Sequence, residues 1–242
     1  MALLDLANPH RFLVLARWLV PGFAVLAFAL LAAGLALGFR APADYQQGET
    51  VRIMYVHVPA AWLALGIYVL MAISALGTLV WRHPLADVAA KAAAPIGAAF
   101  CLICLLTGAL WGRPMWGAYW VWDARLTSML VLFLLYLGIL ALWRAIEEPG
   151  QAGRAVAILT LVGVINIPIV KFSVDWWSTL HQPAAVFRLG GPTIHPSLLT
   201  PLLLCALGFA LLFGTLLLAA MRNEILRRRV RTLRILAAQE AH

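Results

Sequence analysis

Residues 111–128 read WGRPMWGAYWVWDARLTS, and this stretch sets four tryptophans and a tyrosine between two long apolar runs. If the stretch is helical, Trp116, Trp120 and Asp123 share one face, because residues three and four apart are neighbours on a helix. Covering one indole removes roughly 150–250 Å² from water, which stabilises the covered state by about 4–6 kcal/mol at most. Glycines, a proline and arginines in the same stretch argue against a simple buried rod. The stretch therefore predicts a surface that a flat apolar molecule covers.

An ordinary aromatic belt is the alternative interpretation, since Trp and Tyr collect at the headgroup level of a bilayer. Such a belt places one or two rings at a helix end. Five rings in one short segment favour a binding surface over a belt alone.

The composition defines an integral membrane protein. The 242 residues are 64% hydrophobic and 12% charged, against about 25% charged in an ordinary soluble domain. The net charge of +8 lies at the ends of apolar runs, which indicates membrane topology and not nucleic-acid binding. The first apolar run is long enough to span, and no small-residue cleavage pattern follows it, so we expect no cleavable signal peptide. Cys101 and Cys104 form a CxxC pair, a spacing known from redox and metal sites, but inside an apolar run a packing role is favoured.

Six apolar runs have about the length that a bilayer core requires. We expect one all-α membrane domain over residues 1–242, with no internal repeat. Pro59 suits the first turn of the second span, Asp123 suits the N-cap of the fourth, and Asn166 and Pro168 interrupt the fifth. The expected spans are about 18–39, 59–81, 92–110, 126–143, 155–170 and 198–221.

The distribution of Lys and Arg predicts that both termini are cytoplasmic. Twelve basic residues fall on the side of the termini and six on the other, although six of the twelve lie in the C-terminal tail. We expect the tail to contact anionic headgroups. This orientation brings residues 40–56, the tryptophan stretch and residues 171–197 together outside. The inner set is Arg11, Arg17, Arg82, Lys91, Arg144, Arg154, Arg222, Arg227, Arg228, Arg229, Arg231 and Arg234; the outer set is Arg40, Arg52, Arg113, Arg125, Lys171 and Arg188.

Residues 111–128 resemble the tryptophan-rich "WWD" signature of the haem-handling membrane proteins of cytochrome c biogenesis, with Tyr119 where many members have Trp. Six spans, one such segment and this chain length most resemble the haem exporter C (CcmC) family of the cytochrome c maturation system I. The resemblance covers nearly the whole chain. In that family, segments similar to residues 57–62 (HVPAAW) and 176–184 (WWSTLHQPA) supply the two axial histidines.

The resemblance implies a haem-handling protein of the bacterial inner membrane, not an enzyme. It implies that haem b is held transiently as cargo at the periplasmic face and passed to the periplasmic haem chaperone CcmE. It also implies assembly with the ATP-binding-cassette subunits CcmA and CcmB and the small subunit CcmD. The chain lacks a G-x-x-x-x-G-K-[ST] loop, so any ATP chemistry is expected in a partner.

Two histidines are the candidate haem ligands. His57 directly precedes the expected second span, and His181 follows Trp176 and Trp177 in an outer loop. Neutral imidazoles suit the axial positions of haem iron, and Arg52, Arg125 and Arg188 are available for the propionates. Protonation abolishes ligation, so we expect haem retention to weaken as the pH falls through about 6. The expected site comprises His57, His181, Trp111, Trp116, Tyr119, Trp120, Trp122, Asp123 and Arg125, with Asp123 orienting a loop or the acceptor.

Alternatives remain open for the histidines and for the function. Either histidine alone could be a polar residue at a helix end, and His195 is the one other outer histidine that could ligate iron. The helices could form a conduit for haem, although the spans hold no charge near mid-membrane, where a polar route usually needs one. The chain could also be a structural subunit that docks partners through its aromatic face.

Overall fold

The computed structural model describes residues 8–240, and in that range the secondary structure is helical, without strands. Six helical segments within it are long and apolar enough to cross a membrane. The predicted all-α fold with six spans is confirmed. The helices are α1 (Pro9–Arg40), the short 3-10 helix η2 (Glu49–Ile53), α2 (Met54–Leu79), α3 (Ala86–Trp116), α4 (Ala124–Ala145), α5 (Pro149–Gly163), α6 (Asn166–Trp176) and α7 (Pro196–Glu240).

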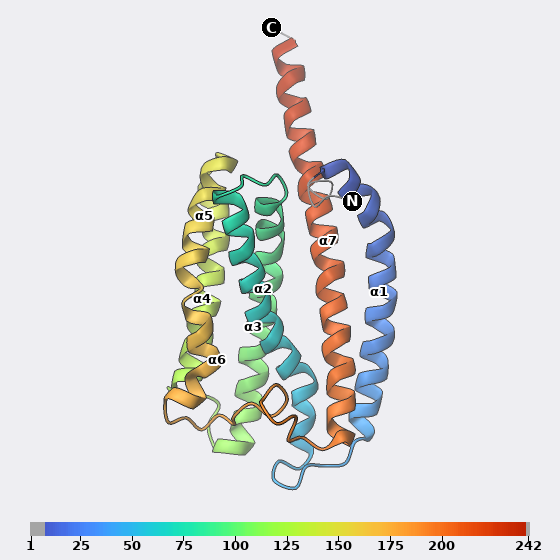
Figure 1. Cartoon of the computed structure of the whole chain (residues 1–242), viewed down its shortest axis with the longest axis vertical. Coiled ribbons are helices and arrows are strands. Elements are labelled where there is room, and N and C mark those ends of the chain that lie inside the picture. The colour runs from blue at the N-terminus through green and yellow to red at the C-terminus, as the bar shows by residue number, and fades with distance from the viewer. Residues whose placement is uncertain (1–7, 241–242) are drawn as a thin grey trace.

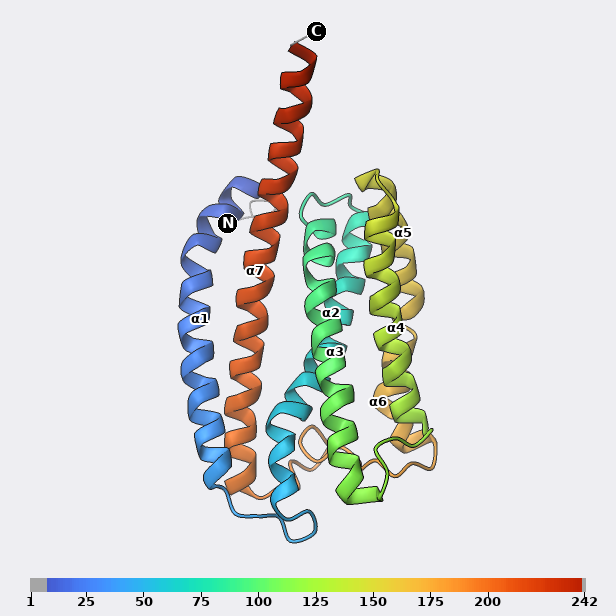
Figure 2. The same ribbon diagram turned by 180° about the vertical axis from the view of Figure 1, so that it is seen from behind.

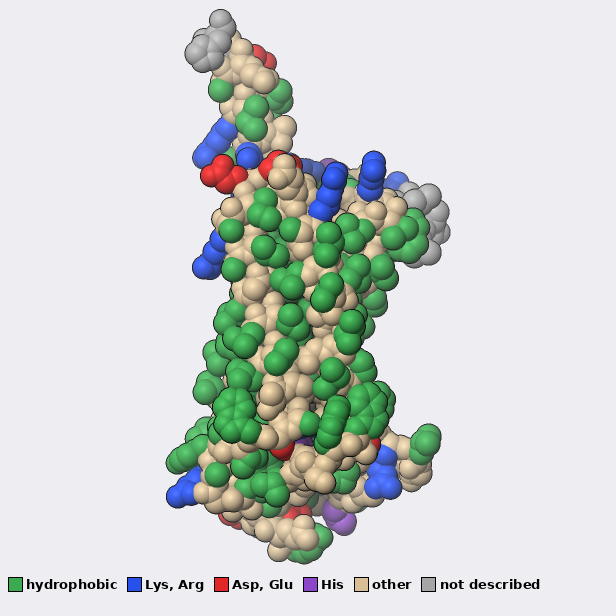
Figure 3. Space-filling model, turned by 90° about the vertical axis from the view of Figure 1, so that its left-hand side faces the viewer, with side chains coloured by type: hydrophobic (Ala, Val, Ile, Leu, Met, Phe, Trp, Pro, Cys, Tyr) green, Lys and Arg blue, Asp and Glu red, His purple; other side chains and the backbone are tan. Residues whose placement is uncertain are grey.

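The helices form two groups that lie side by side. α1 and α7 make a pair, and α2 to α6 make a bundle next to it (Figures 1 and 2). The start of α1 and the C-terminal part of α7 lie at one end, where α7 projects beyond the other helices. The loops 41–48, 117–123 and 177–195 lie at the opposite end, which we call the loop end. Figure 3 shows lysines and arginines toward the two ends and a band of hydrophobic side chains between them.

Glycines let α1 and α7 approach closely, as small residues do between membrane helices. A Cβ at Gly34 of α1 would stand 2.7 Å from the Cys205 sulfur and 2.9 Å from its backbone nitrogen. A Cβ at Gly208 of α7 would stand 2.8 Å from Leu31 of α1. Larger residues at these positions would separate the pair.

Two tyrosines fill the centre of the second group. Tyr68 of α2 and Tyr136 of α4 are fully buried and meet edge to face, with ring centroids 5.3 Å apart. The Tyr136 hydroxyl donates a 2.8 Å hydrogen bond to the Ala64 carbonyl. Gly97 of α3 makes room for the Tyr136 ring, because a Cβ there would lie 2.4 Å from it.

A break separates α5 from α6 within the expected fifth span. The helix stops before Asn166 because Pro168 cannot donate to the carbonyl of Val164, and its ring clashes with that carbonyl. The Asn166 side chain then donates a 2.9 Å hydrogen bond to the Ser128 carbonyl of α4. The polar residue of this span therefore ties the break to a neighbouring helix.

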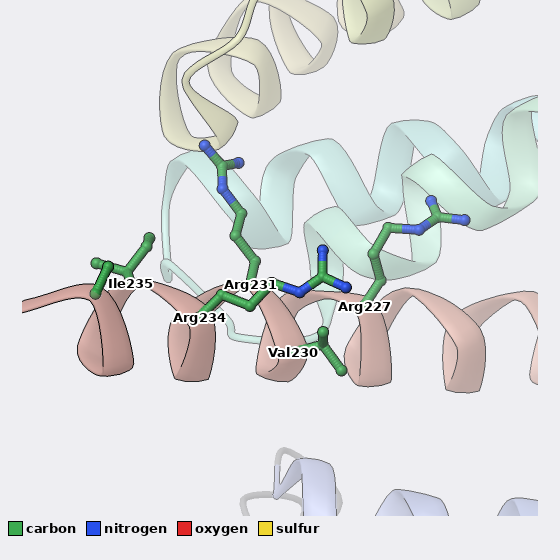
Figure 4. Close-up of a pocket in the computed structure, with 6 residues that line it drawn as sticks. Arg227, Val230, Arg231, Arg234 and Ile235 are labelled. Atoms are coloured by element: carbon green, nitrogen blue, oxygen red, sulfur yellow. The ribbon is translucent and has the colours of Figure 1, made fainter. Parts of the chain in front are cut away.

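An ionic cluster joins α3 to α7 at the end away from the loops. The buried carboxylate of Glu224 accepts from Lys91 at 2.8 Å and from Arg228 at 3.0 Å. Arg228 also contacts Asp87 of α3 at 2.7 Å. Beyond this cluster the projecting part of α7 borders an open groove of about 540 Å³. Its lining includes Arg227, Val230, Arg231, Arg234 and Ile235, and Arg227 and Arg231 reach toward the neighbouring helices (Figure 4).

Candidate functional site

The tryptophan stretch is only partly helical, so the prediction that residues 111–128 form one helix is wrong. α3 continues through Trp116 and ends at Gly117, whose φ of +78° is the left-handed conformation that favours glycine. Residues 117–123 are not helical, and α4 starts after Asp123, whose carboxylate accepts from the Leu126 amide at 2.7 Å. The expected N-cap at Asp123 is confirmed. Trp116, Trp120 and Asp123 therefore do not share one helical face.

His57 lies within α2, and the expectation that it directly precedes the helix is wrong. The 3-10 helix η2 and the first residues of α2 come before it, so Pro59 also lies beyond the first turn. The His57 side chain is buried, and its Nδ1 lies 3.0 Å from the Thr107 hydroxyl of α3. Its ring meets Trp111 edge to face, with centroids 5.6 Å apart. One face of the second span thus presents an imidazole to the end of the third.

His181 lies in the loop 177–195 and is held by its neighbours. Its backbone amide donates to the Thr179 hydroxyl at 3.0 Å, and that hydroxyl in turn donates to the Asp123 carboxylate. Its ring packs against Trp116, with centroids 6.1 Å apart. Burial, and then the positive charge of Arg125, hold the pKa of His181 below its usual value. The ring is therefore neutral, the form that binds iron, at neutral pH.

The structure brings the two candidate ligands to the same part of α3. His57 packs on Trp111 and His181 packs on Trp116, five residues further along the helix. No group of three or more His, Cys, Asp or Glu side chains that could hold a metal ion occurs within residues 8–240.

The other rings of the stretch form a second, more exposed group. Trp120 and Trp122 meet edge to face, with centroids 5.4 Å apart, and Arg113 lies over Tyr119 at 5.7 Å. Trp122 is 77% exposed and Tyr119 is 58% exposed. The buried indole N–H groups of Trp111 and Trp120 have no acceptor among the described residues. The surface is therefore a partly open rim beside the histidines and not a single flat bed.

The three arginines expected near propionates differ in their partners. Arg125 donates to the Ser173 hydroxyl and to the Lys171 carbonyl, each at 3.1 Å, and so ties α4 to α6. Arg52 pairs with Glu49 at 2.6 Å. Arg188 is exposed in the loop 177–195. Of the three, Arg125 is the one whose positive charge lowers the pKa of His181.

Sequence reasoning missed the threonines behind both histidines. Thr107 lies one helical turn before Trp111, and this spacing was the available signal, since residues four apart share a face. Thr179 lies two residues before His181, at the spacing of a local side-chain turn. His195, the substitute ligand, is exposed and contacts the Ser197 hydroxyl at 2.8 Å, near the start of α7.

The three cysteine thiols are buried in the packing between helices. Cys101, Cys104 and Cys205 are buried and form no disulfide. Cys101 donates to the Met129 carbonyl at 3.6 Å. The CxxC pair thus packs between α3 and α4, in agreement with the packing role expected from the sequence.

The fold and this end together define a class: helical membrane proteins with six spans and a tryptophan-rich, histidine-bearing end. Comparison with known proteins refines the class. The family model described as "Heme exporter protein C" matches residues 2–236. The chain belongs to this family.

Curated relatives of the same description agree with this assignment. The chain is similar to heme exporter protein C of Bradyrhizobium diazoefficiens, with 65% identity over 98% of this chain and 90% of the relative. It is 49% identical to that of Escherichia coli K12 over 92% of this chain and 90% of the relative. For Paracoccus denitrificans the identity is 44% over 96% and 97%.

Proposed function

We propose that the chain takes part in cytochrome c maturation by holding haem at the loop end and passing it to an acceptor protein. His57 and His181 supply the axial imidazoles, and the indoles of the tryptophan stretch cover part of the porphyrin. The haem is cargo, iron protoporphyrin IX (haem b), which the chain handles without converting it. The observation that carries the proposal is the placement of two imidazoles from separate segments on neighbouring tryptophans of α3.

Further features support this assignment. His57 is buried and His181 is half-buried, so both rings sit in an environment that strengthens ligation over solvation. Arg125 is the best candidate for a propionate, because its positive charge acts on His181 and lowers the pKa of that ring. Trp122 and Tyr119 stay exposed and leave an edge of the site open to an acceptor. The relatives' printed name, heme exporter protein C, agrees with haem as the cargo.

The proposal extends to location and partners. We infer that the loop end faces the periplasm of the inner membrane, with the termini in the cytoplasm. There the acceptor is the haem chaperone CcmE, and CcmA, CcmB and CcmD complete an ABC-type complex. A periplasmic acceptor can reach the exposed rim at the loop end, while the basic end lies beside the anionic cytoplasmic leaflet.

Haem absorption of the purified chain tests the ligand assignment. We expect His57→Ala and His181→Ala each to alter the spectrum, and the double variant to lose most bound haem. His195→Ala is the matched control, because His195 is an exposed histidine of the same end and should leave the spectrum unchanged. Unaltered absorption in the double variant would refute the assignment. Trp120→Ala should lower haem occupancy while the helices still insert.

Labelling of single cysteines tests the orientation. Leu189 is 99% exposed in the loop 177–195, and Arg82 is exposed at the opposite end. The native cysteines are buried, so Leu189→Cys and Arg82→Cys report separately. We expect an impermeant maleimide to label position 189 and not position 82 in intact spheroplasts. The reverse pattern would place the site in the cytoplasm.

A further inference from the structure

Thr107 of α3 lies behind His57 of α2. Its hydroxyl contacts Nδ1 of His57, which is the ring nitrogen nearer to the His57 backbone. We propose that Thr107 is a positioning residue that fixes the tautomer of His57, so that Nε2 carries the free electron pair offered to iron. This inference rests on the proposed function, in which His57 is a haem ligand. It adds which ring nitrogen of His57 binds iron, and the physical reason for that choice.

The Thr107 hydroxyl already donates its one hydrogen within α3. Its oxygen lies 2.6 Å from the Ile103 carbonyl and 3.3 Å from the Cys104 carbonyl. A hydroxyl near the carbonyl four residues earlier on a helix donates to it. Because the hydroxyl has one hydrogen and two lone pairs, its contact with His57 must then be made by a lone pair.

The His57 ring therefore donates from Nδ1. The two atoms are 3.0 Å apart, a normal distance for an N–H···O hydrogen bond. A neutral imidazole carries one N–H, so a proton on Nδ1 leaves Nε2 bare. Metal-binding histidines usually donate their other N–H to an acceptor in this way.

The next residue of α3 fixes the plane of the ring. A Cβ at Gly108 would stand 3.0 Å from Cε1 of His57 and 3.6 Å from Nδ1. The imidazole thus lies against the α3 backbone where no side chain intervenes. Trp111, one turn beyond Thr107, packs edge to face on the same imidazole, with the two ring planes at 83°. The position of the ring and the place of its proton are both set by one turn of α3.

Nuclear magnetic resonance of the haem-free chain with isotope-labelled histidine tests the tautomer directly. Assignment uses the signal that disappears in His57→Ala. We expect His57 to carry its proton on Nδ1 in the wild type and in Thr107→Ser, which keeps the hydroxyl. In Thr107→Val, which has nearly the same shape, we expect a mixture of tautomers. A wild-type ring protonated on Nε2 would overturn the proposal, and no haem is needed for this readout.

Haem titration provides the second test. We expect Thr107→Val to weaken haem binding by about 10–100-fold, the usual effect of losing such a hydrogen bond, and Thr107→Ser to restore it. Loss of the hydrogen bond also makes the imidazole a weaker donor to ferric iron, so the reduction potential of the bound haem should rise. A merely structural role would not move this potential.

The outcomes separate this inference from the proposed function. If His57→Ala changes the haem spectrum but Thr107→Val keeps wild-type affinity and potential, the role of Thr107 is refuted while His57 remains a ligand. If His57→Ala has no effect on the spectrum, the ligand assignment itself fails. Should Thr107→Val not insert into the membrane, the tautomer of the wild type still decides.

Discussion

Replacing Asp123 by alanine should release the segment that carries His181 while leaving the helices in place. The Asp123 carboxylate makes two hydrogen bonds: one oxygen accepts from the Leu126 amide and the other from the Thr179 hydroxyl. The Thr179 hydroxyl in turn accepts from the His181 amide. Asp123 is thus the point where the tryptophan stretch holds the loop 177–195.

The expected magnitude follows from these two hydrogen bonds. Loss of an N-cap costs about 0.5–2 kcal/mol. A hydrogen bond to a charged group contributes about 1.5–3 kcal/mol, and the lower end applies because Asp123 is only half-buried. We therefore expect opening of residues 177–182 to become easier by about 1.5 kcal/mol, which is roughly tenfold in the opening equilibrium.

Hydrogen–deuterium exchange measures this opening in the detergent-solubilised protein. We expect exchange across residues 177–182 to accelerate about tenfold in Asp123→Ala, with α7 unchanged. Asp175→Ala is the matched control, since it removes an exposed carboxylate of α6 that accepts no hydrogen bond in the described structure. Thr179→Val should give a similar acceleration in this segment, because it breaks the same link.

The double variant decides whether the two residues act as one link. Changes in one hydrogen-bonded pair are not additive, whereas independent changes are. We expect Asp123→Ala with Thr179→Val to exchange little faster in residues 177–182 than either single variant. Wild-type exchange in Asp123→Ala, or fully additive effects in the double variant, would refute this account of how His181 is held.

Three further results are expected. Burial and a neighbouring positive charge lower the pKa of His181 below its usual 6.5, so its ring stays neutral to lower pH. Bound haem should therefore be constant above pH 6.5 and fall only below it. A spectroscopic pH titration measures this, and loss of haem that begins above pH 6.5 would contradict it. Gly97→Ala should destabilise the bundle by about 1–3 kcal/mol through overpacking, because its Cβ would lie 2.4 Å from the Tyr136 ring; thermal unfolding in detergent measures it, against Gly66→Ala, where a Cβ meets nothing. Glu224→Ala should cost about 3 kcal/mol, since Lys91 loses its buried partner, and a wild-type melting temperature would show that the cluster is not stabilising.

Much of the fold could be predicted because membrane spans depend on local composition. Six apolar runs predicted six spans, and the helix start at Asp123 followed from its capping side chain. The ends of helices were harder to predict. Gly117 ends α3 after Trp116, but a glycine inside an aromatic run gives no local sign of which conformation it takes.

The candidate site was predictable by residue type and not by contact. The histidines and tryptophans stood out because they are unusual beside a membrane span. Their supports did not, because Thr107 and Thr179 are common residues and His57 is 50 positions from its threonine. The Lys91–Glu224 pair spans 133 positions, and no periodicity in the sequence joins two such helices.

The two candidate ligands differ in how firmly the chain holds them. His57 is part of α2, so moving it requires a whole helix to shift, whereas His181 belongs to a loop and its backbone is linked through Thr179 to Asp123. Breaking one link in a loop takes far less free energy than displacing a packed helix. If the two histidines bind haem as proposed, haem departure should begin on the His181 side, while His57 keeps its place on the iron and an incoming protein offers its own ligand. Transfer would then proceed by exchange at one axial position, and free haem need never enter solution.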